Sequence, residues 1–233
     1  MLHLHSVVVY RIVLTVMMLR NLAFGFRGVV NLQSSRCTIQ TSTSCHRSRL
    51  MSSLSAAKVP TVEVSPSDHG TTPLSKFTSS SVLDKRLVKT LQSSALDIKI
   101  PTTIQSHAMP LLFNSYDIMA SSATGSGKTL MFGLPLLNQL LLTVDRQPRN
   151  QQNMGLPTAL IISPTRELAV QTCDVLTSFK TNINICLATG GSDSRSQRKA
   201  LPNCNVLVGT PGRICQFLDE RNLSLQSVNY LVM

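Results

Sequence analysis

The stretch with the clearest chemical potential is residues 122–129, which read Ser-Ala-Thr-Gly-Ser-Gly-Lys-Thr. Gly125 and Gly127 can adopt positive φ and let the backbone approach a ligand closely. Loop amides of this kind bind phosphate oxygens together with the N-terminus of the following helix. Lys128 would reach the β- and γ-phosphates of a nucleotide, and the Thr129 hydroxyl would ligate Mg²⁺. The pattern is Gly-x-x-x-x-Gly-Lys-[Ser/Thr] with serine in place of the first glycine, and it predicts a nucleotide site rather than an ordinary glycine-rich turn.

The elements that would position this loop lie on both sides of it. The run 117–120 predicts a buried strand before the loop, and residues 128–142 predict a helix after it. Farther along, short apolar strands alternate with helices. The strands are expected at about 159–162, 183–188, 205–208 and 228–233, and the helices at about 164–179, 194–200 and 209–219. This alternation predicts the α/β class, with a parallel sheet and helices on both faces.

Two further helices are predicted before the loop. Residues 82–91 repeat apolar side chains at helical spacing, and a second helix opens near Pro101. Gln105 would lie on the first turns of that second helix. Its amide offers a donor and an acceptor that match N7 and the N6 amino group of adenine. From this stretch alone, however, an ordinary polar residue on a helix surface is the better interpretation. Residues 145–155 are predicted to form a polar surface loop.

The composition limits the class of protein. A length of 233 residues suits one large or two modest domains. The formal net charge is +11, but the first 59 residues carry seven of the 22 basic residues and no acidic residue, which leaves 15 basic and 11 acidic side chains for the remainder. The folded part therefore has only a mild positive bias for binding polyanions. The six cysteines include no Cys-x-x-Cys pair, which favours reduced, mostly buried thiols in an intracellular protein over a zinc site built on Cys45 and His46.

The first part of the chain resembles a targeting segment. Residues 1–55 are rich in Arg, Ser and Thr and lack acidic residues, as in an organellar transit peptide. The apolar run 7–19 is shorter than a transmembrane helix and contains Arg11, which also disfavours a secretory signal, although an organellar bipartite leader stays open. We favour mitochondrial import over a plastid, and a misassigned start would place the protein in the nucleus or cytoplasm. Residues 56–76 are rich in Pro, Ser and Thr and are interpreted as a disordered linker.

Five motifs in a fixed order resemble those of DEAD-box RNA helicases. They are Pro-Thr-Thr-Ile-Gln (101–105), Ser-Ala-Thr-Gly-Ser-Gly-Lys-Thr (122–129), Pro-Thr-Arg-Glu-Leu-Ala (164–169), Gly-Gly (190–191) and Thr-Pro-Gly-Arg (210–213). The resemblance covers about residues 82–233, and five ordered motifs are far more specific than any one of them. It implies that residues 77–233 are a truncated ATP-binding, RecA-like domain of a P-loop NTPase.

The resemblance assigns a nucleotide role to Gln105 as the adenine reader and to Ile98, which stands where the family usually has an aromatic residue against the base. Asp97 replaces a frequent glycine of the family, and Phe77 matches the family's upstream phenylalanine only loosely. Lys128 and Thr129 become the catalytic residues, with Thr129 as the ligand of Mg²⁺. The predicted nucleotide-binding residues are Ile98, Gln105, Ser122, Ala123, Thr124, Gly125, Ser126, Gly127, Lys128 and Thr129.

The remaining motifs fall at or just after the C-terminal ends of predicted strands, which is the edge where open α/β sheets bind ligands. By similarity they would follow an RNA backbone, because amides, hydroxyls and arginines suit phosphate oxygens and carry little sequence information. Each motif alone is also typical of an ordinary helix-start turn. The predicted RNA-binding residues are Pro164, Thr165, Arg166, Gly190, Gly191, Thr210, Gly212 and Arg213.

The family's Asp-Glu-Ala-Asp motif would follow the predicted strand at 230–233, and it does not occur in these 233 residues. Asp219 and Glu220 end a helix and cannot replace it. The expectation is therefore a fragment of an ATP-dependent RNA helicase that couples ATP binding and hydrolysis to clamping and unwinding RNA, with this piece alone inactive in hydrolysis. ATP, Mg²⁺ and RNA are the expected ligands, without stable membrane insertion. The alternatives are a truncated, non-catalytic isoform that binds RNA or a partner, and another P-loop enzyme such as a small-molecule kinase.

Overall fold

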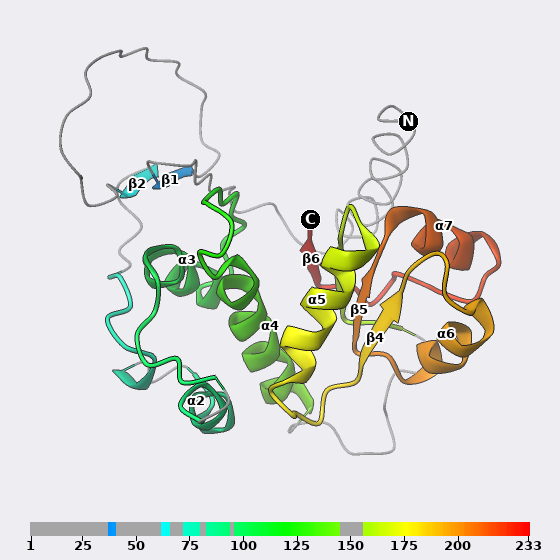
Figure 1. Cartoon of the computed structure of the whole chain (residues 1–233), viewed down its shortest axis with the longest axis horizontal. Helices are drawn as coiled ribbons and strands as arrows, with labels where there is room; N and C mark the ends of the chain where they lie inside the picture. The colour runs from blue at the N-terminus through cyan, green and yellow to red at the C-terminus, as the bar shows by residue number, and fades with distance from the viewer. Residues whose placement is uncertain (1–36, 41–61, 66–71, 80–82, 94–95, 145–155) are drawn as a thin grey trace, which may run out of the picture. The chain divides into compact units, whose positions relative to one another are not determined.

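The computed structural model describes residues 37–40, 62–65, 72–79, 83–93, 96–144 and 156–233 (Figure 1). These residues divide into two compact units. We call the one within Phe26–Pro135 the amino-terminal unit and the one within Leu136–Met233 the carboxyl-terminal unit. The boundary between the two units, at Pro135 and Leu136, falls inside residues 77–233. That these residues form a single truncated domain therefore stays a prediction.

The amino-terminal unit is mainly helical. Its elements are β1 (Cys37–Gln40), β2 (Val62–Ser65), η1 (Phe77–Ser79), α2 (Lys85–Leu91), α3 (Thr103–Phe113) and the start of α4 (Lys128–Val144). β1 and β2 pair in parallel. β2 lies within the predicted linker, and most of the other linker residues lie outside the described residues. Most of the predicted transit peptide, including the apolar run 7–19, also lies outside them.

The helices of this unit begin two to three residues after their predicted starts. The Asp84 side chain caps α2 by accepting a hydrogen bond from the backbone N–H of Arg86 at 2.8 Å. α3 begins at Thr103, two residues after Pro101, because a proline has no N–H to donate and fixes the chain as it enters the helix. α3 and the first turns of α4 pack around a small core of Ile104, Ala108, Leu111 and Met131.

The strand predicted at 117–120 is absent, which corrects that part of the sequence analysis. The segment is irregular backbone, and no described strand pairs with it. Ile118 and Ala120 still pack against the α3–α4 core, while Met119 between them is exposed. The apolar run that suggested a strand is thus only partly packed, and a strand also needs a neighbour with which to exchange backbone hydrogen bonds.

The carboxyl-terminal unit contains a four-stranded parallel sheet in the order β4-β5-β3-β6. The strands are β3 (Ala159–Ile162), β4 (Ile185–Ala188), β5 (Val206–Gly209) and β6 (Tyr230–Val232). Every residue of β3 and β5 is buried, as is usual for the central strands of a parallel sheet. β4 lies at one edge of the sheet, and its residues alternate between buried and half-buried.

Helices cover both faces of this sheet, so the predicted fold class is confirmed. They are α5 (Arg166–Thr177), α6 (Ser194–Ala200), η3 (Leu201–Asn203) and α7 (Pro211–Asp219). Figure 1 shows α5 on one side of β4 and β5, and α6 and α7 on the other. Ile214 and Phe217 of α7 are fully buried against Leu160 and Leu207 of the central strands. The end of α4 also belongs to this unit.

The cysteines with described side chains are Cys173, Cys186, Cys204 and Cys215, and all four are free thiols, as predicted. A hydrogen bond with Cys186, together with burial, raises the pKa of the Cys204 thiol. No cluster of three or more His, Cys, Asp or Glu side chains occurs within the described residues, and Cys45 and His46 lie outside them. None of the helices in the described part of the chain combines the length and apolar character needed to cross a bilayer.

Candidate nucleotide site and nucleic-acid interface

The phosphate loop, residues 122–129, has the backbone conformation that the sequence predicts for it. Gly125 and Gly127 take φ values of +77° and +88°, which a residue with a side chain rarely adopts. The Lys128 ammonium folds back over the loop and donates hydrogen bonds to the carbonyl oxygens of Ser122 at 2.7 Å and Ala123 at 2.8 Å. The loop thus holds a cation at its centre through neutral acceptors, and phosphate oxygens would be stronger partners for that cation.

The start of α4 offers backbone donors that suit an anion. Lys128, Thr129 and Leu130 form the first turn of the helix, whose backbone N–H groups have no partner within the helix. Such a turn attracts phosphate through both its free donors and the helix dipole. The Thr129 side chain is half-buried, and its hydroxyl is of the type that coordinates Mg²⁺ beside phosphates. These residues therefore fit a magnesium nucleotide.

Thr102 and Gln105 connect the beginning of α3 to the phosphate loop. The Gln105 amide nitrogen donates to the carbonyl of Gly127 at 3.0 Å, and its amide oxygen accepts from the backbone N–H of Thr102 at 3.0 Å. The Thr102 hydroxyl donates to the carbonyl of Ser126 at 2.7 Å. Gln105 is 1% exposed, so in this structure its amide serves as a link between helix and loop. Its role as adenine reader stays a prediction.

The link to Gln105 also explains why position 127 is a glycine. A Cβ built on Gly127 would lie 2.2 Å from the Gln105 amide nitrogen, whereas a Cβ on Gly125 would have no atom within 4 Å. Thr102 was missed as a contributor to this site. The pattern Thr-x-x-Gln at 102–105 is a helix-capping signature that could have identified the pair.

The segment before α3 carries the remaining nucleotide predictions. Asp97 adopts φ = +45°, a conformation that favours glycine and that aspartate tolerates better than most residues. This backbone agrees with the inference that Asp97 replaces a glycine of the family. Ile98 is half-buried, and its N–H donates to the carbonyl of Leu91 at 2.8 Å. Phe77 is 1% exposed, so its ring lies within the core of the amino-terminal unit.

The predicted RNA-binding residues meet at one edge of the sheet in the carboxyl-terminal unit. They occupy the loops that follow β3, β4 and β5, which we call the strand-end loops (163–166, 189–193 and 210–213). Because these three strands are neighbours and parallel, their C-terminal ends lie side by side. The sequence predicted this placement at strand ends, and only the strand order brings the three loops together.

Arg166, which follows β3, packs against the double glycine of the loop after β4. A Cβ on Gly191, where φ is +79°, would lie 2.0 Å from a guanidinium nitrogen of Arg166, and a Cβ on Gly190 would lie 3.3 Å from another. The glycines therefore let an exposed guanidinium approach the backbone of the loop closely. Thr165 precedes it as the cap of α5, with its hydroxyl oxygen 3.3 Å from the N–H of Leu168, and Pro164 is exposed.

In the segment after β5, Gly212 is exposed and Arg213 is hydrogen-bonded to other residues. Gly212 is exposed, and a Cβ built on it would have no atom within 4 Å, so its backbone is accessible to a ligand. Arg213 instead donates to the side-chain oxygen of Gln197 at 3.0 Å and to the carbonyl of Ser192 at 3.1 Å. The predicted phosphate contact of Arg213 would require these bonds to be shared or exchanged. Thr210 begins α7 and is half-buried.

Gln197 of α6 is a residue that the sequence analysis did not identify. Besides accepting from Arg213, it donates to the carbonyl of Thr189 at 3.1 Å, so it joins the loops after β4 and β5. No sequence signal could have identified it, because its partners come from other elements.

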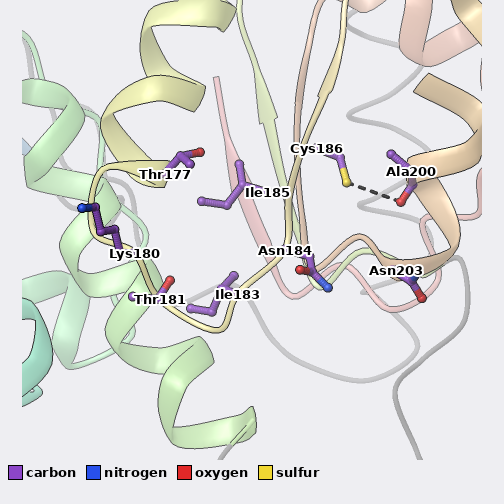
Figure 2. A pocket seen from close by; sticks show the side chains of 9 residues that line it. All are labelled: Thr177, Lys180, Thr181, Ile183, Asn184, Ile185, Cys186, Ala200 and Asn203. Atoms are coloured by element: carbon purple, nitrogen blue, oxygen red, sulfur yellow. Dashed lines mark hydrogen bonds between the residues drawn. The ribbon is translucent and has the colours of Figure 1, made fainter. Parts of the chain in front are cut away.

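A cavity of about 550 Å³ lies away from these loops, at the N-terminal end of β4. Its walls include Ile183, Asn184, Cys186 and Ala200, and Figure 2 shows Cys186 and Ile185 pointing to opposite sides of the strand. The Cys186 thiol lies 3.5 Å from the carbonyl oxygen of Ala200. None of the predicted site residues lines this cavity.

Comparison with known proteins finds similar helicases. The chain is 42% identical over 126 residues to the ATP-dependent RNA helicase DBP3 of Coccidioides immitis, which covers 53% of this chain and 24% of that protein. It is 40% identical over 128 residues to a probable ATP-dependent RNA helicase of Methanocaldococcus jannaschii, covering 54% of this chain and 32% of that protein. The chain thus spans about a quarter to a third of the length of these curated relatives.

A solved structure is also similar. The crystal structure of a DEAD box protein from the hyperthermophile Methanococcus jannaschii superimposes with a TM-score of 0.57 at 34% sequence identity, covering 68% of this chain and 41% of that one. The family model of the DEAD/DEAH box helicases matches residues 102–233, more than half of the chain. None of these comparisons favours the non-catalytic isoform or a small-molecule kinase. The chain belongs to the DEAD/DEAH box helicase family.

Proposed function

We propose that this chain is the nucleotide-binding part of an ATP-dependent RNA helicase, which binds ATP with Mg²⁺ at the phosphate loop and the backbone of single-stranded RNA at the strand-end loops. The complete protein would couple ATP binding and hydrolysis to clamping and unwinding RNA. The observation that carries the proposal is the Lys128 ammonium, which lies at the centre of a loop with two positive-φ glycines at the start of a helix.

Lys128 and the residues around it would have different roles in binding the nucleotide. Its ammonium would leave the two carbonyls and neutralise charge on the β- and γ-phosphates, while the first-turn amides of α4 hold the phosphate oxygens. Mg²⁺, when bound beside the Thr129 hydroxyl, would supply further neutralisation of the phosphates. Thr102 and Gln105 would keep the loop in the receptive conformation, since both hold its carbonyls from outside.

RNA binding at the strand-end loops is supported by the types of group collected there. Exposed Arg166, the open backbone of Gly212 and the hydroxyls of Thr165 and Thr210 are donors suited to phosphate oxygens. No aromatic side chain lies in these loops, so stacking on bases would contribute little. Binding is therefore expected to depend weakly on RNA sequence and strongly on salt.

The nucleotide proposal is tested by titrating the chain with a fluorescent ATP analogue and Mg²⁺. Lys128→Ala removes charge-assisted hydrogen bonds, so its affinity is expected to fall by about 10- to 100-fold. Lys89→Ala is the matched control, because Lys89 is an exposed lysine of the same unit on α2. Equal affinity of Lys128→Ala and the unaltered chain would refute the site.

We also propose a mitochondrial location, which rests on the acid-free, Arg- and Ser-rich composition of residues 1–55. A fluorescent protein fused to the C-terminus of the chain should colocalise with a mitochondrial marker. Fluorescence in plastids or in the nucleus and cytoplasm would instead favour the other two locations.

A further inference from the structure

Helix α6 carries a concentrated positive charge and contributes no buried side chain. Its sequence is Ser-Arg-Ser-Gln-Arg-Lys-Ala, with three cations and no acidic residue. Five of its seven residues are exposed, and the other two are half-buried. Its neighbour η3 instead contributes Leu201, which is 2% exposed, to the core of the unit. The composition of α6 is therefore not explained by the core of the unit.

The helix is nevertheless held firmly at the edge of the sheet where the strand-end loops lie. Gln197 donates to the carbonyl of Thr189 and accepts from Arg213, and Arg213 also donates to the carbonyl of Ser192. The Arg213 guanidinium in turn lies 5.5 Å from the centre of the Phe217 ring, which is fully buried. These contacts join α6 to the loops after β4 and β5.

The orientation of Gln197 decides where the cations point. At about 100° per residue, positions 195 and 199 lie on the opposite side of the helix from position 197. Arg195 and Lys199 are four residues apart and exposed, so they are neighbours on the outer surface. Arg198 is on the same side, three residues from Arg195.

The acidic groups near this surface leave most of its charge available. Asp193 uses its carboxylate to cap α6, accepting from the N–H groups of Arg195 and Ser196 at 3.0 and 3.1 Å. Glu220 lies 3.5 Å from Arg198 but also accepts from Gln216 and Asn222 at 2.8 Å each. Within the described residues, no salt bridge involves the side chain of Arg195 or Lys199.

We infer that the outer surface of α6 extends the RNA-binding surface, so that a single strand passing Gly190 and Gly191 continues over Arg195 and Lys199 through its phosphates. This inference rests on the proposed function. Two exposed cations one helical turn apart, beside a loop whose residues 191–193 are exposed, suit a chain of regularly spaced phosphates. Because no aromatic side chain lies on α6, the contact is independent of base sequence.

The test compares two oligouridylates, one of about five and one of about fifteen nucleotides, within the span of site sizes seen for single-strand binders. The full chain and the double variant Arg195→Gln/Lys199→Gln are titrated by fluorescence anisotropy. The variant should bind the long RNA about tenfold more weakly, the sum of two exposed charge pairs. Its salt dependence should fall by roughly 1.4 in slope, or 0.7 for each lost phosphate contact. Affinity for the short RNA and for the ATP analogue should not change.

Lys180→Gln is the matched control, since Lys180 is an exposed cation near the opposite end of β4, and it should leave both RNA affinities unchanged. Equal weakening by Lys180→Gln, or no change in the salt slope of the double variant, would overturn the inference. If Arg166→Gln weakens binding of both RNAs while the double variant weakens neither, α6 is not part of the path but the proposed function stands. If the unaltered chain binds no RNA in low salt, the proposed function itself fails, and the inference fails with it.

Discussion

At the scale of single residues, Gly125 and Gly127 of the phosphate loop have different structural roles. Both have positive φ, so alanine at either position strains the backbone. Only Gly127 is also in contact with a buried side chain, since its Cβ would meet the Gln105 amide. Gly125 is therefore needed for the backbone conformation of the loop. Gly127 is needed for that conformation and also for the contact between the loop and Gln105 of α3.

This difference predicts unequal losses of stability. Gly125→Ala should lower the free energy of unfolding by about 1 kcal/mol, the cost of an unfavourable φ. Gly127→Ala should lower it by a further ~1–3 kcal/mol because of the added crowding. Urea denaturation measures both, and adding Gln105→Ala to Gly127→Ala should recover part of the extra loss. Equal losses for the two alanine variants would contradict the role assigned to Gln105.

Two other glycines, at the end of β5 and the start of α7, offer a second contrast. A Cβ on Gly209 would lie 2.5 Å from the carbonyl oxygen of Ala188, the residue paired with it on β4. A Cβ on Gly212 would meet nothing within 4 Å, and this residue lies in a helix. Gly209→Ala should destabilise the chain by about 1–3 kcal/mol. Gly212→Ala should stabilise it by roughly 0.5–1 kcal/mol. Thermal unfolding distinguishes them, and a stabilising Gly209→Ala would mean that β4 and β5 are less closely apposed.

At the scale of elements, carboxylates mark the starts of three helices. A hydrogen bond from Arg86 lowers the pKa of Asp84 at α2. Backbone hydrogen bonds from Arg195 and Ser196 lower the pKa of Asp193 at α6. A hydrogen bond from its own backbone N–H lowers the pKa of Glu167 in the first turn of α5. Negative charge at these positions also interacts favourably with the helix dipole.

A lowered pKa in the folded state means that these carboxylates stabilise the fold when ionised. That contribution is complete above their ordinary values of 3.8 for Asp and 4.5 for Glu, and it is lost as the pH falls through the lower folded values. Asp84→Asn keeps the oxygen that caps α2 and removes the charge, and Asp193→Asn removes the charge and keeps one of the two oxygens that cap α6. The difference in unfolding free energy between the chain and this double variant should be largest near neutral pH and shrink below pH 4. A difference that does not change with pH would contradict the assignment.

At the scale of the whole molecule, the two candidate sites lie in different compact units. The phosphate loop and its links to Thr102 and Gln105 lie in the amino-terminal unit, and the strand-end loops lie in the carboxyl-terminal unit. A ligand stabilises the residues that it binds, so each ligand should protect its own unit from local opening.

Amide hydrogen exchange tests this separation. Saturating ATP analogue with Mg²⁺ should slow exchange at residues 102–131, and a saturating long oligouridylate should slow it at the strand-end loops and α6. At 100 times the dissociation constant, the stabilisation is about 2.7 kcal/mol, or roughly 100-fold in exchange rate. Lys128→Ala should abolish only the first effect. Protection of the strand-end loops by nucleotide without RNA would show that the sites are coupled.

Much of the fold and of the candidate site could be predicted from the sequence. The positive-φ glycines, the start of α4 and the three loops at strand ends follow from local preferences of glycine, proline and apolar residues, which act within a few positions of the chain. Predicted β3, β4 and β5 agree with the structure to within two residues at each end.

Only the tertiary structure decided the rest, because it depends on partners that are distant in sequence. The order β4-β5-β3-β6 brings Arg166 against Gly191, and Gln197 to Arg213. For the same reason residues 117–120 form no strand despite their apolar side chains, since a strand requires hydrogen bonds from a neighbour that no local pattern specifies. The sequence by itself therefore determined which groups could bind phosphates. The contacts between residues distant in sequence decided which of these groups are exposed, such as Gly212, and which are hydrogen-bonded to other side chains, such as Arg213.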